Sequence, residues 1–474
     1  MIDGLKSYPE MKETGLPWLG RIPEHWQLER MKFILRERNE RGFPDEPLLA
    51  ATQTKGVVRK EEYENRTVLA LKDLHLLKRV HVGDFVISLR SFQGGIEYAR
   101  EQGIISPAYT VLFPNDQSTH GFLAWLLKSK PYIENLSLFV TGIRQGQNID
   151  YQKLGRSALP LPPREERGSI VRFLGYADRC IRSYIRVKQK LIKLLDAQKQ
   201  AIIHRAVTRG LDPHVRLKSS GVEWIDHIPE HWEVRRAKQL CTAIIDCKNR
   251  TPEMVPGGNF TVVRTTNIRN GKFLKQGSYP TDRNNYEIWT YRGAPRKGDV
   301  FFTREAPAGE ACLVPDTDNL CMGQRMMYFR PDPTLLDAHF LLHSIYGPLI
   351  RRYVEVVTNG STVGHLRLGQ VYGMPILWCP LEEQIRIVHF IQEHLEPLFA
   401  TGERAGKEVA FIREFRKRLI ADAVTGKLDV TEAVTRLRDE VGELDALEEA
   451  TTSVENDEDG VETEVEATPQ EAAE

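Results

Sequence analysis

Several polar side chains of the sequence have the chemistry needed to read nucleic acid. Arginine, asparagine, glutamine, serine and threonine side chains bond to base edges, while lysine, arginine and backbone N–H groups bind phosphates. In the first half of the chain, the candidates lie in two glycine-containing segments: Arg90, Ser91 and Gln93, then Arg144, Gln145, Gln147 and Asn148. In the second half, they are Arg264, Thr265, Asn267, Arg269, Arg304, Gln324, Arg325, Asn359, Ser361, Thr362 and His365. The alternative for each is a solvated turn or, for Arg304 beside Glu305, a local ion pair.

Motifs for catalysis are absent from the sequence. It contains neither an Asn-Pro-Pro nor an Asp-Pro-Pro-Tyr adenine-pocket motif, and no glycine-rich cofactor loop follows a predicted strand. Residues 402–407, GERAGK, are one residue too short for a P-loop and fall in a predicted helix. The six cysteines include no CxxC pair, which argues against a zinc ribbon or a disulfide framework. We therefore predict no catalytic residue and no metal site.

The charge is unevenly distributed along the chain. The 65 basic and 65 acidic residues cancel overall, but residues 431–474 hold 16 acidic residues against two arginines. The remaining 430 residues therefore carry a net charge of +14. A basic body is typical of a protein that binds a polyanion, and the acidic tail has the composition of a disordered segment.

The chain also repeats itself. The segment GLPWLGRIPEHWQLERMKFIL at 15–35 recurs as GVEWIDHIPEHWEVRRAKQLC at 221–241, an offset of 206. The offset reaches 217 where PREE at 163–166 aligns with PLEE at 380–383 and AVT at 206–208 aligns with AVT at 423–425. A tryptophan that follows proline in both copies favours packing, so we assign His25 and His231 of IPEHW to structure and not to catalysis. Two copies of one unit predict a pseudo-twofold molecule.

The pattern within each copy predicts an α+β recognition domain followed by a long helix. Short β-branched runs and glycine or proline turns indicate the mixed domain, and proline before a glutamate-rich turn indicates the helix start. A ladder of 3–4 spacing runs from 174 to 202 and from 391 to 419, which favours an antiparallel coiled-coil pair. Pro397, with Gly402 and Gly406, predicts a kink or a break in the second helix. The predicted boundaries are 1–160, 161–212, 213–379 and 380–430, with a disordered acidic tail at 431–474.

These features together resemble the specificity subunit of a type I restriction-modification system. The resemblance covers about residues 15–430 and is carried by the duplicated W…IPEHW motif, the helix start P-x-E-E and the helix end A-V-T…L-D. It implies that each globular domain is a target-recognition domain for half of a bipartite DNA sequence. The helix pair would set the distance between half-sites.

The resemblance also implies partners and their cofactors. Double-stranded DNA and two methyltransferase (modification) subunits are expected, with restriction (translocase and nuclease) subunits in a full complex. S-adenosylmethionine would belong to the methyltransferase and ATP and magnesium to the restriction partner, so this chain itself would hold no cofactor. We expect the partner-docking helices to use Leu174, Ile181, Leu191, Leu195, Ile202, Ile391, Leu398, Ile412, Phe415 and Leu419.

Two other functions stay open at this point. One is a self-contained DNA methyltransferase or nuclease with an unrecognised active site, and the other is a coiled-coil scaffold that binds DNA without sequence preference. No stretch reaches the roughly 20 apolar residues of a membrane span, and the N-terminus lacks the apolar core of an export signal, so we expect a cytoplasmic protein without membrane contact.

Overall fold

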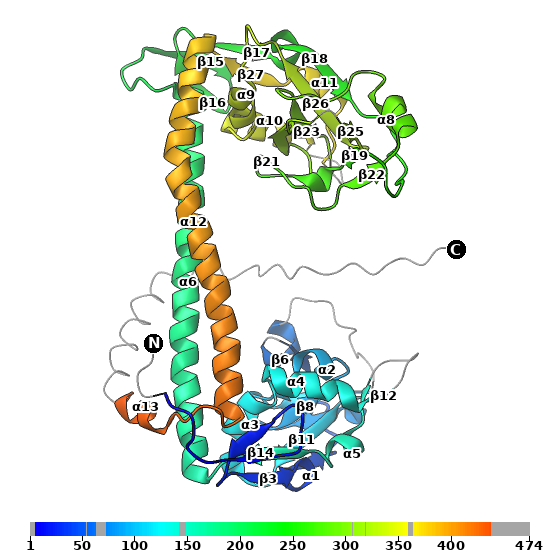
Figure 1. Cartoon of the computed structure of the whole chain (residues 1–474), viewed down its shortest axis with the longest axis vertical. Coiled ribbons are helices and arrows are strands. Elements are labelled where there is room, and N and C mark those ends of the chain that lie inside the picture. Colours follow the sequence, from blue (N-terminus) through cyan, green and yellow to red (C-terminus); the bar gives the residue numbers. More distant parts are fainter. Residues whose placement is uncertain are drawn as a thin grey trace. The chain divides into compact units, whose positions relative to one another are not determined.

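The computed structural model of the chain divides into two compact units (Figure 1). It describes residues 5–53, 55–62, 73–141, 148–305, 307–317, 319–358 and 364–437. Unit 1 comprises Met1–Arg186 and Val409–Glu474, and unit 2 comprises Val187–Glu408. Each of the two long helices, α6 (Arg164–Arg209) and α12 (Leu381–Val424), contributes one part to each unit.

Unit 1 is built on an antiparallel sheet with the strand order β4-β11-β8-β9. The sheet strands are β4 (Leu35–Arg38), β11 (Thr110–Pro114), β8 (Phe85–Ile87) and β9 (Glu97–Tyr98). Antiparallel pairs join β1 (Met11–Glu13) to β2 (Arg21–Pro23), β3 (Gln27–Arg30) to β14 (Ala158–Leu161), β5 (Leu49–Thr52) to β6 (Gly56–Arg59), β7 (Lys78–Val80) to β10 (Gly103–Ile105) and β12 (Val140–Thr141) to β13 (Asn148–Ile149). The shorter helices are α1 (Met31–Ile34), α2 (Ser91–Gly94), α3 (His120–Leu126), α4 (Lys130–Leu136), α5 (Tyr151–Leu154) and α13 (Thr431–Arg436), with 3-10 turns at Lys60–Glu62, Leu74–Leu76, Gln117–Thr119 and Ser137–Phe139.

Unit 2 repeats this plan with the central order β18-β26-β23-β24. Its sheet strands are β18 (Cys241–Asp246), β26 (Met326–Pro331), β23 (Val300–Thr303) and β24 (Ala311–Leu313). A second sheet orders β22 (Tyr279–Thr281), β19 (Phe260–Val263) and β25 (Leu320–Met322), and pairs join β15 (Leu217–Val222) to β16 (Ile225–Pro229), β17 (Glu233–Arg236) to β27 (Pro375–Trp378) and β20 (Ile268–Arg269) to β21 (Lys272–Phe273). The helices are α7 (Ala237–Leu240), α8 (Arg283–Thr290), α9 (Ala338–Ile345), α10 (Pro348–Thr358) and α11 (Leu368–Tyr372), and a 3-10 turn lies at Thr265–Asn267.

The central sheet of each unit is buried on both faces. Successive side chains of a strand point to opposite faces, so Phe85 and Ile87 enter one apolar cluster while Val86 enters another. In unit 2, Val300 and Phe302 are separated from Phe301 in the same way. The apolar runs FVIS and VFFT are therefore continuous because both faces need apolar side chains. Both units are mixed α+β, as the sequence predicts.

The more buried side chains of α12 follow a regular 3–4 spacing that differs from the predicted ladder at alternate positions. On α12, the more buried positions are 391, 395, 398, 402, 405, 409, 412, 416, 419 and 423. The ladder 391, 398, 405, 412 and 419 is confirmed, but its other half lies one residue too early. Within unit 2, Lys188 Nζ lies 2.7 Å from Glu408 Oε2 and Lys199 lies 4.4 Å from the ring of Phe399, so the two helix segments of this unit run in opposite directions.

Pro397 neither ends nor splits the second helix, so the predicted break is wrong. The helix α12 continues through Pro397 from Leu381 to Val424. Proline removes one backbone donor, but the neighbouring Leu395 is 4% exposed and packs in the unit 2 core. This packing keeps the turn helical.

The predicted disorder of the tail is wrong for its first residues. Residues 431–436 form α13, and Ala433, Val434 and Leu437 are buried in the core of unit 1. These apolar side chains are spaced for one helix face, which the acidic composition of the tail conceals. The rest of the tail prediction, from residue 438 onward, lies outside the described residues.

Candidate nucleic-acid interface

The duplicated IPEHW motif joins each globular domain to the first turn of its long helix. The buried Trp26 indole donates to Glu166 at 2.8 Å, and a His25 ring nitrogen lies 2.8 Å from the same carboxylate. In unit 2, the Trp232 indole donates to Glu383 at 3.1 Å and His231 lies 2.8 Å from it. We call each set a tryptophan–histidine–glutamate clamp. These contacts explain both histidines by structure, in agreement with their assignment from the sequence.

The end of the other copy's helix closes each clamp. Gly210, with φ +68°, follows α6, and a Cβ added there would lie 3.2 Å from Glu383 Oε1 and 3.4 Å from the Trp232 ring. Gly426, with φ +73°, follows α12, and an added Cβ would lie 2.3 Å from Pro23. Both positions need glycine because the backbone is left-handed and approaches the clamp closely. The repeated A-V-T…L-D segments thus mark a helix end that docks in the same way in each unit.

In unit 1, the first predicted recognition segment forms the short helix α2 and its flanks. Arg90 and Gln93 are exposed, whereas Ser91 is 1% exposed and its hydroxyl accepts from the backbone N–H of Ser88 at 2.8 Å. Gly95 has φ +86°, and an added Cβ would lie 2.5 Å from the Leu127 carbonyl. Arg90 and Gln93 can therefore reach a ligand, while Ser91 shapes the segment.

A buried ion pair lies just after this segment. Lys128 Nζ donates to both carboxylate oxygens of Glu97, at 2.8 and 2.9 Å, and to the Gln53 carbonyl at 2.8 Å. Burial raises the pKa of Glu97 to about 7, and Lys128 opposes that rise only in part. Gln53 in turn lies against Gly94 of α2, where an added Cβ would lie 2.7 Å from Gln53 Cγ. The pair thus connects the sheet to α2.

The second segment of unit 1 is described only at its borders. Thr141 and Asn148 face each other across the β12–β13 pair. Arg144, Gln145 and Gln147 lie outside the described residues, as does the side chain of Asn148. Their prediction as DNA-binding residues stays a prediction.

In unit 2, the segment after β19 forms a turn fixed by a buried amide. Asn267 is fully buried, and its side chain donates to the carbonyls of Leu274 and Gln276 at 2.7 and 3.0 Å. Its Oδ1 accepts from Arg264 N at 2.8 Å. Asn267 therefore holds the turn and cannot reach a base, whereas Arg264 and Arg269 are exposed and Thr265 is half-buried.

Three further loops of unit 2 converge beside this turn on Glu305. The Arg325 guanidinium lies 3.4 Å and the His365 ring 3.5 Å from the Glu305 carboxylate. Backbone bonds join the loops, because Arg304 N donates to the Arg325 carbonyl at 2.9 Å and Leu366 N to the Arg304 carbonyl at 3.0 Å. Gly323 N donates to the Val263 carbonyl at 2.7 Å, which connects the Arg264 turn to the same group. The structure thus brings together predicted residues from four separate segments.

The members of this convergent surface differ in what they can contact. Arg304 is 7% exposed and pairs with Asp246 at 3.1 Å. Its side chain therefore stabilises the loop after β23 and is not available to a ligand. Arg325 has φ +71°, and its side chain is 48% exposed. Gln324 and His365 are exposed as well. Asn359, Ser361 and Thr362 lie outside the described residues.

The sequence reading missed a basic and aromatic group at the end of β18. Lys248 Nζ lies 5.4 Å from the Trp289 ring and 4.9 Å from the Tyr291 ring, and the Trp289 indole donates to the Arg250 carbonyl at 2.8 Å. The hydroxyl of Thr251 accepts from Gln324 N at 3.4 Å, which places this group beside the convergent surface. The signal in the sequence was the basic run KNR at 248–250 directly after a β-branched strand.

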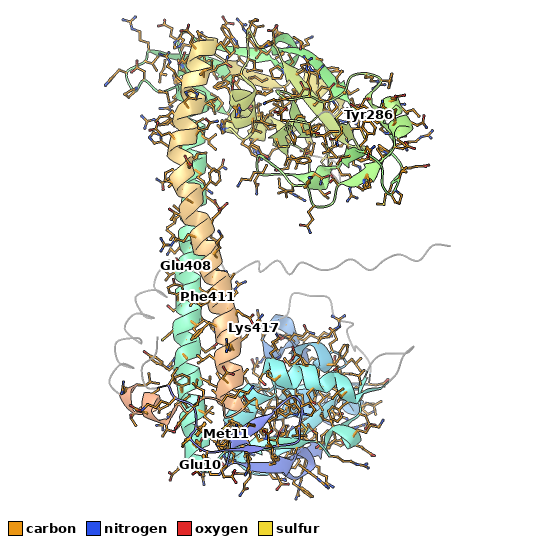
Figure 2. All side chains as sticks on the ribbon, viewed as in Figure 1. Glu10, Met11, Tyr286, Glu408, Phe411 and Lys417 are labelled. Carbon is orange, nitrogen blue, oxygen red and sulfur yellow. The ribbon has the colours of Figure 1, made fainter. Side chains whose placement is uncertain are left out.

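The predicted partner-docking residues divide into buried and accessible positions. Leu174, Ile181, Leu195, Ile391 and Leu419 are buried within the chain, so they hold α6 and α12 in place. Leu191, Ile202, Leu398 and Ile412 are half-buried, and Phe415 is 39% exposed. Other exposed apolar side chains of the two helices were not predicted: Val187, Leu194, Ile385, Phe399 and Phe411, the last of which is 69% exposed on α12 (Figure 2).

The described residues show no site for a metal and no membrane helix. They contain no group of three His, Cys, Asp or Glu side chains that could hold a metal ion. Among the same residues, none of the helices combines the length and the apolar character needed to cross a bilayer.

Comparison with known proteins agrees with this architecture. Residues 229–405 match the family model of the type I restriction modification DNA specificity domain, while a search of the curated proteins finds no match. A structure solved to explain complex assembly and conformational transition of the type I R-M system shares 18% identity, with 85% of this chain and 98% of that chain covered and a TM-score of 0.62.

Two further structures are similar at lower scores. The HsdS subunit from Thermoanaerobacter tengcongensis has 17% identity, 86% and 98% coverage and a TM-score of 0.46. The S subunit of the type I restriction-modification system from M. genitalium has 12% identity, 88% and 98% coverage and a TM-score of 0.35. Residues 229–405 thus match the type I restriction modification DNA specificity domain, and the fold of the chain is similar to that of a chain in the structure of the type I R-M system.

Proposed function

We propose that the chain is the sequence-specific DNA-recognition subunit of a type I restriction-modification complex and performs no catalytic step itself. Each unit reads one half of a bipartite target. The observation that carries this proposal is the convergence of Arg264, Arg325 and His365 on one surface of unit 2, within the segment that matches the specificity domain. The fold is repeated in unit 1, so one chain has two such readers.

The convergent surface suits direct reading of a base edge. An arginine guanidinium presents a planar pair of donors that matches the two acceptors of guanine in the major groove. Glu305 holds Arg325 at 3.4 Å and so limits its rotamers before DNA arrives. Lys248 and Arg250, beside two aromatic rings, supply positive charge for phosphates. In unit 1, Arg90 and Gln93 have the corresponding role on α2.

We further propose that α6 and α12 form one antiparallel coiled-coil pair related by a pseudo-twofold axis. Support comes from the seam with 3–4 spacing and from the reciprocal docking of Gly210 and Gly426 on the two clamps. At 1.5 Å per residue, a helix of this length spans about 65–70 Å, on the order of two turns of DNA. The pair would set the distance between the two half-sites.

The exposed apolar side chains of the long helices are the proposed contacts for methyltransferase subunits. Val187, Leu194 and Phe411 are 58%, 60% and 69% exposed, which is unusual for large apolar side chains unless a partner covers them. We propose two methyltransferase subunits, with S-adenosylmethionine bound in them and not in this chain. ATP and magnesium would enter with restriction subunits.

The test exploits the independence of the two half-sites. The full chain is used to select bound sequences from a random duplex library, at several salt concentrations because phosphate contacts weaken steeply with salt. Arg325→Ala should relax one half of the selected motif and leave the other half unchanged, with a loss of about 1–3 kcal/mol at the affected position. Arg90→Ala with Gln93→Ala should relax the opposite half.

The matched control is Arg352→Ala, which removes an exposed arginine of α10 in the same unit as Arg325. It should leave both halves of the motif intact. Binding without any selected sequence would contradict the proposal and favour a non-specific scaffold. Methyl transfer from S-adenosylmethionine by the chain alone would contradict its non-catalytic role.

A further inference from the structure

An arginine-rich groove lies in unit 1, where residues of α6 meet residues of the globular domain and of the segment that holds α13. Its volume is about 560 Å³. Four arginines line it: Arg100, Arg172, Arg179 and Arg182. Trp125 and Tyr176 add aromatic surface, and Val434 of α13 and Leu437, which follows this helix, complete the lining.

The positive charge of this groove is only weakly neutralised within the chain. Asp178 is its one acidic lining residue, and it pairs with Arg182 at 2.7 Å and also with Arg416. Arg172 and Arg179 are exposed and have no carboxylate within ion-pair distance among the described residues. The groove therefore attracts an anionic ligand.

The charge is a property of the first copy alone. At the repeat offset of 217, Arg172 corresponds to His389, Arg179 to Glu396 and Arg182 to Phe399. Tyr176 corresponds to Glu393. A role shared by both copies, such as the clamp or the seam, thus does not explain these arginines. These arginines are instead explained by a ligand that binds unit 1 only.

The acidic C-terminal segment begins at this groove. Leu437 is the last described residue and is itself part of the groove wall. Residues 438–474 contain 15 acidic residues and one arginine. A segment tethered at the rim has an effective concentration on the order of mM, which a free ligand in solution rarely matches.

The apolar spacing of α13 also continues into this segment. Val434 and Leu437 face the groove, and the next apolar residues, Val441 and Leu444, follow at intervals of four and three. Asp445 and Glu448 follow directly after these apolar residues in the sequence. The sequence therefore has apolar residues to meet Trp125 and acidic residues to meet the arginines.

We propose that the acidic segment 438–474 of the chain occupies the arginine-rich groove of its own unit 1, with its first part, around residues 441–448, in contact with α6. The bound segment neutralises the groove and keeps other polyanions, including non-target DNA, away from it. Its binding depends on charge, so it weakens as salt rises and the Debye length falls from about 10 Å at 0.1 M to about 3 Å at 1 M.

The test places a photo-reactive benzoylphenylalanine at Leu444 in the full-length chain and maps the cross-links by mass spectrometry. Cross-links should fall on residues 171–182 or on Trp125 and should weaken in 1 M salt. Arg172→Ala with Arg179→Ala should lower their yield roughly fivefold, since each exposed charge pair contributes about 0.2–1 kcal/mol. Circular dichroism of each variant checks that the fold is retained.

The matched control is Arg413→Ala with Lys427→Ala, which removes two exposed cations of unit 1 outside the groove. It should leave the cross-link yield unchanged. Cross-links elsewhere, no cross-links, or a yield that ignores the groove substitutions would overturn the proposal. Isotope-mixed chains that show only intermolecular cross-links would overturn it in favour of a second copy as the source of the segment. No DNA is needed, so these outcomes do not depend on the proposed function.

Discussion

Glu166 and Glu383 show how one carboxylate can organise a whole domain boundary. Each accepts a hydrogen bond from a buried tryptophan indole and contacts an exposed histidine. In unit 1, Tyr8 adds a third contact to Glu166, and burial raises the pKa of its hydroxyl. A buried indole N–H without an acceptor loses its water and gains nothing in return. The clamps therefore depend on the glutamate more than on the histidine.

Replacing Glu383 by alanine should lower the free energy of unfolding of unit 2 by about 1–3 kcal/mol, because the Trp232 indole loses its acceptor. Glu382→Ala is the matched control, since Glu382 is exposed and lies in the same first turn of α12. Urea denaturation of both variants measures the difference. Equal losses in the two variants would show that the negative charge of the first helical turn, and not the hydrogen bond of the clamp, stabilises unit 2.

Glu97 leads to a second prediction, which concerns how the free energy of unfolding of unit 1 depends on pH. Its folded pKa of about 7 exceeds the ordinary value of 4.5, so between these values the unfolded chain loses a proton that the folded chain retains. The free energy of unfolding of unit 1 should therefore fall as pH rises from about 4.5 to about 7 and then level off. Glu97→Gln should flatten this slope.

Hydrogen exchange of the β8 and β11 amides, corrected for the intrinsic pH dependence of exchange, reports on unit 1 alone. Glu134→Gln removes an exposed glutamate of the same unit and should leave the slope as it is. An unchanged slope in Glu97→Gln would mean that the carboxyl is ionised throughout this range.

The long helices show where apolar periodicity suffices as a guide and where it fails. Positions 391, 398, 405, 412 and 419 were predicted because they are apolar or small and regularly spaced. The other half of the seam was placed one residue early because Gly402 and Arg416 are not apolar. Arg416 is tolerated there because it bonds to Asp178 of α6, a partner that only the folded pair supplies.

The convergent surface of unit 2 was likewise predicted only in part from the sequence. The sequence selected these segments because of their polar residue types, and two of them also because they contain glycine and match in position between the two copies, but it did not predict that they lie side by side in unit 2. It could not separate Asn267 and Arg304, which are buried and structural, from Arg264 and Arg325, because residue type alone does not reveal which side of a turn faces the core. Lys248 was missed because its aromatic neighbours lie about 40 residues away in the sequence.

Pro397 leads to a prediction for the α12 helix. A proline inside a helix removes one hydrogen bond and costs about 3 kcal/mol relative to alanine. Pro397→Ala should therefore raise the free energy of unfolding of unit 2 by roughly 1–3 kcal/mol, since the residue is exposed and the helix is already continuous. Urea denaturation measures this, with Glu396→Ala as the control. A loss of stability would mean that the local bend produced by proline is needed for packing.

At the scale of the whole molecule, the proposed helix pair makes the spacing of the DNA target a matter of helix length. Inserting seven residues after Lys188 and seven after Lys407 adds two turns to both helices and preserves the 3–4 seam. The gap between the half-sites should lengthen by about 10 Å, or roughly three base pairs, while both half-sites stay the same. Selection from a random library reads out both properties. A gap of constant length would reject the proposed spacing role.

The division of the chain also bears on its synthesis at the ribosome. Unit 2 is one contiguous stretch, Val187–Glu408, whereas the core of unit 1 includes Leu419, Ala423, Val430 and Val434 from the far end of the chain. A nascent chain that has completed its N-terminal 186 residues still exposes the apolar surface that those late residues cover. The first domain to be translated is thus the last to complete its apolar core. For most of translation, its stability depends on contacts among its early residues alone.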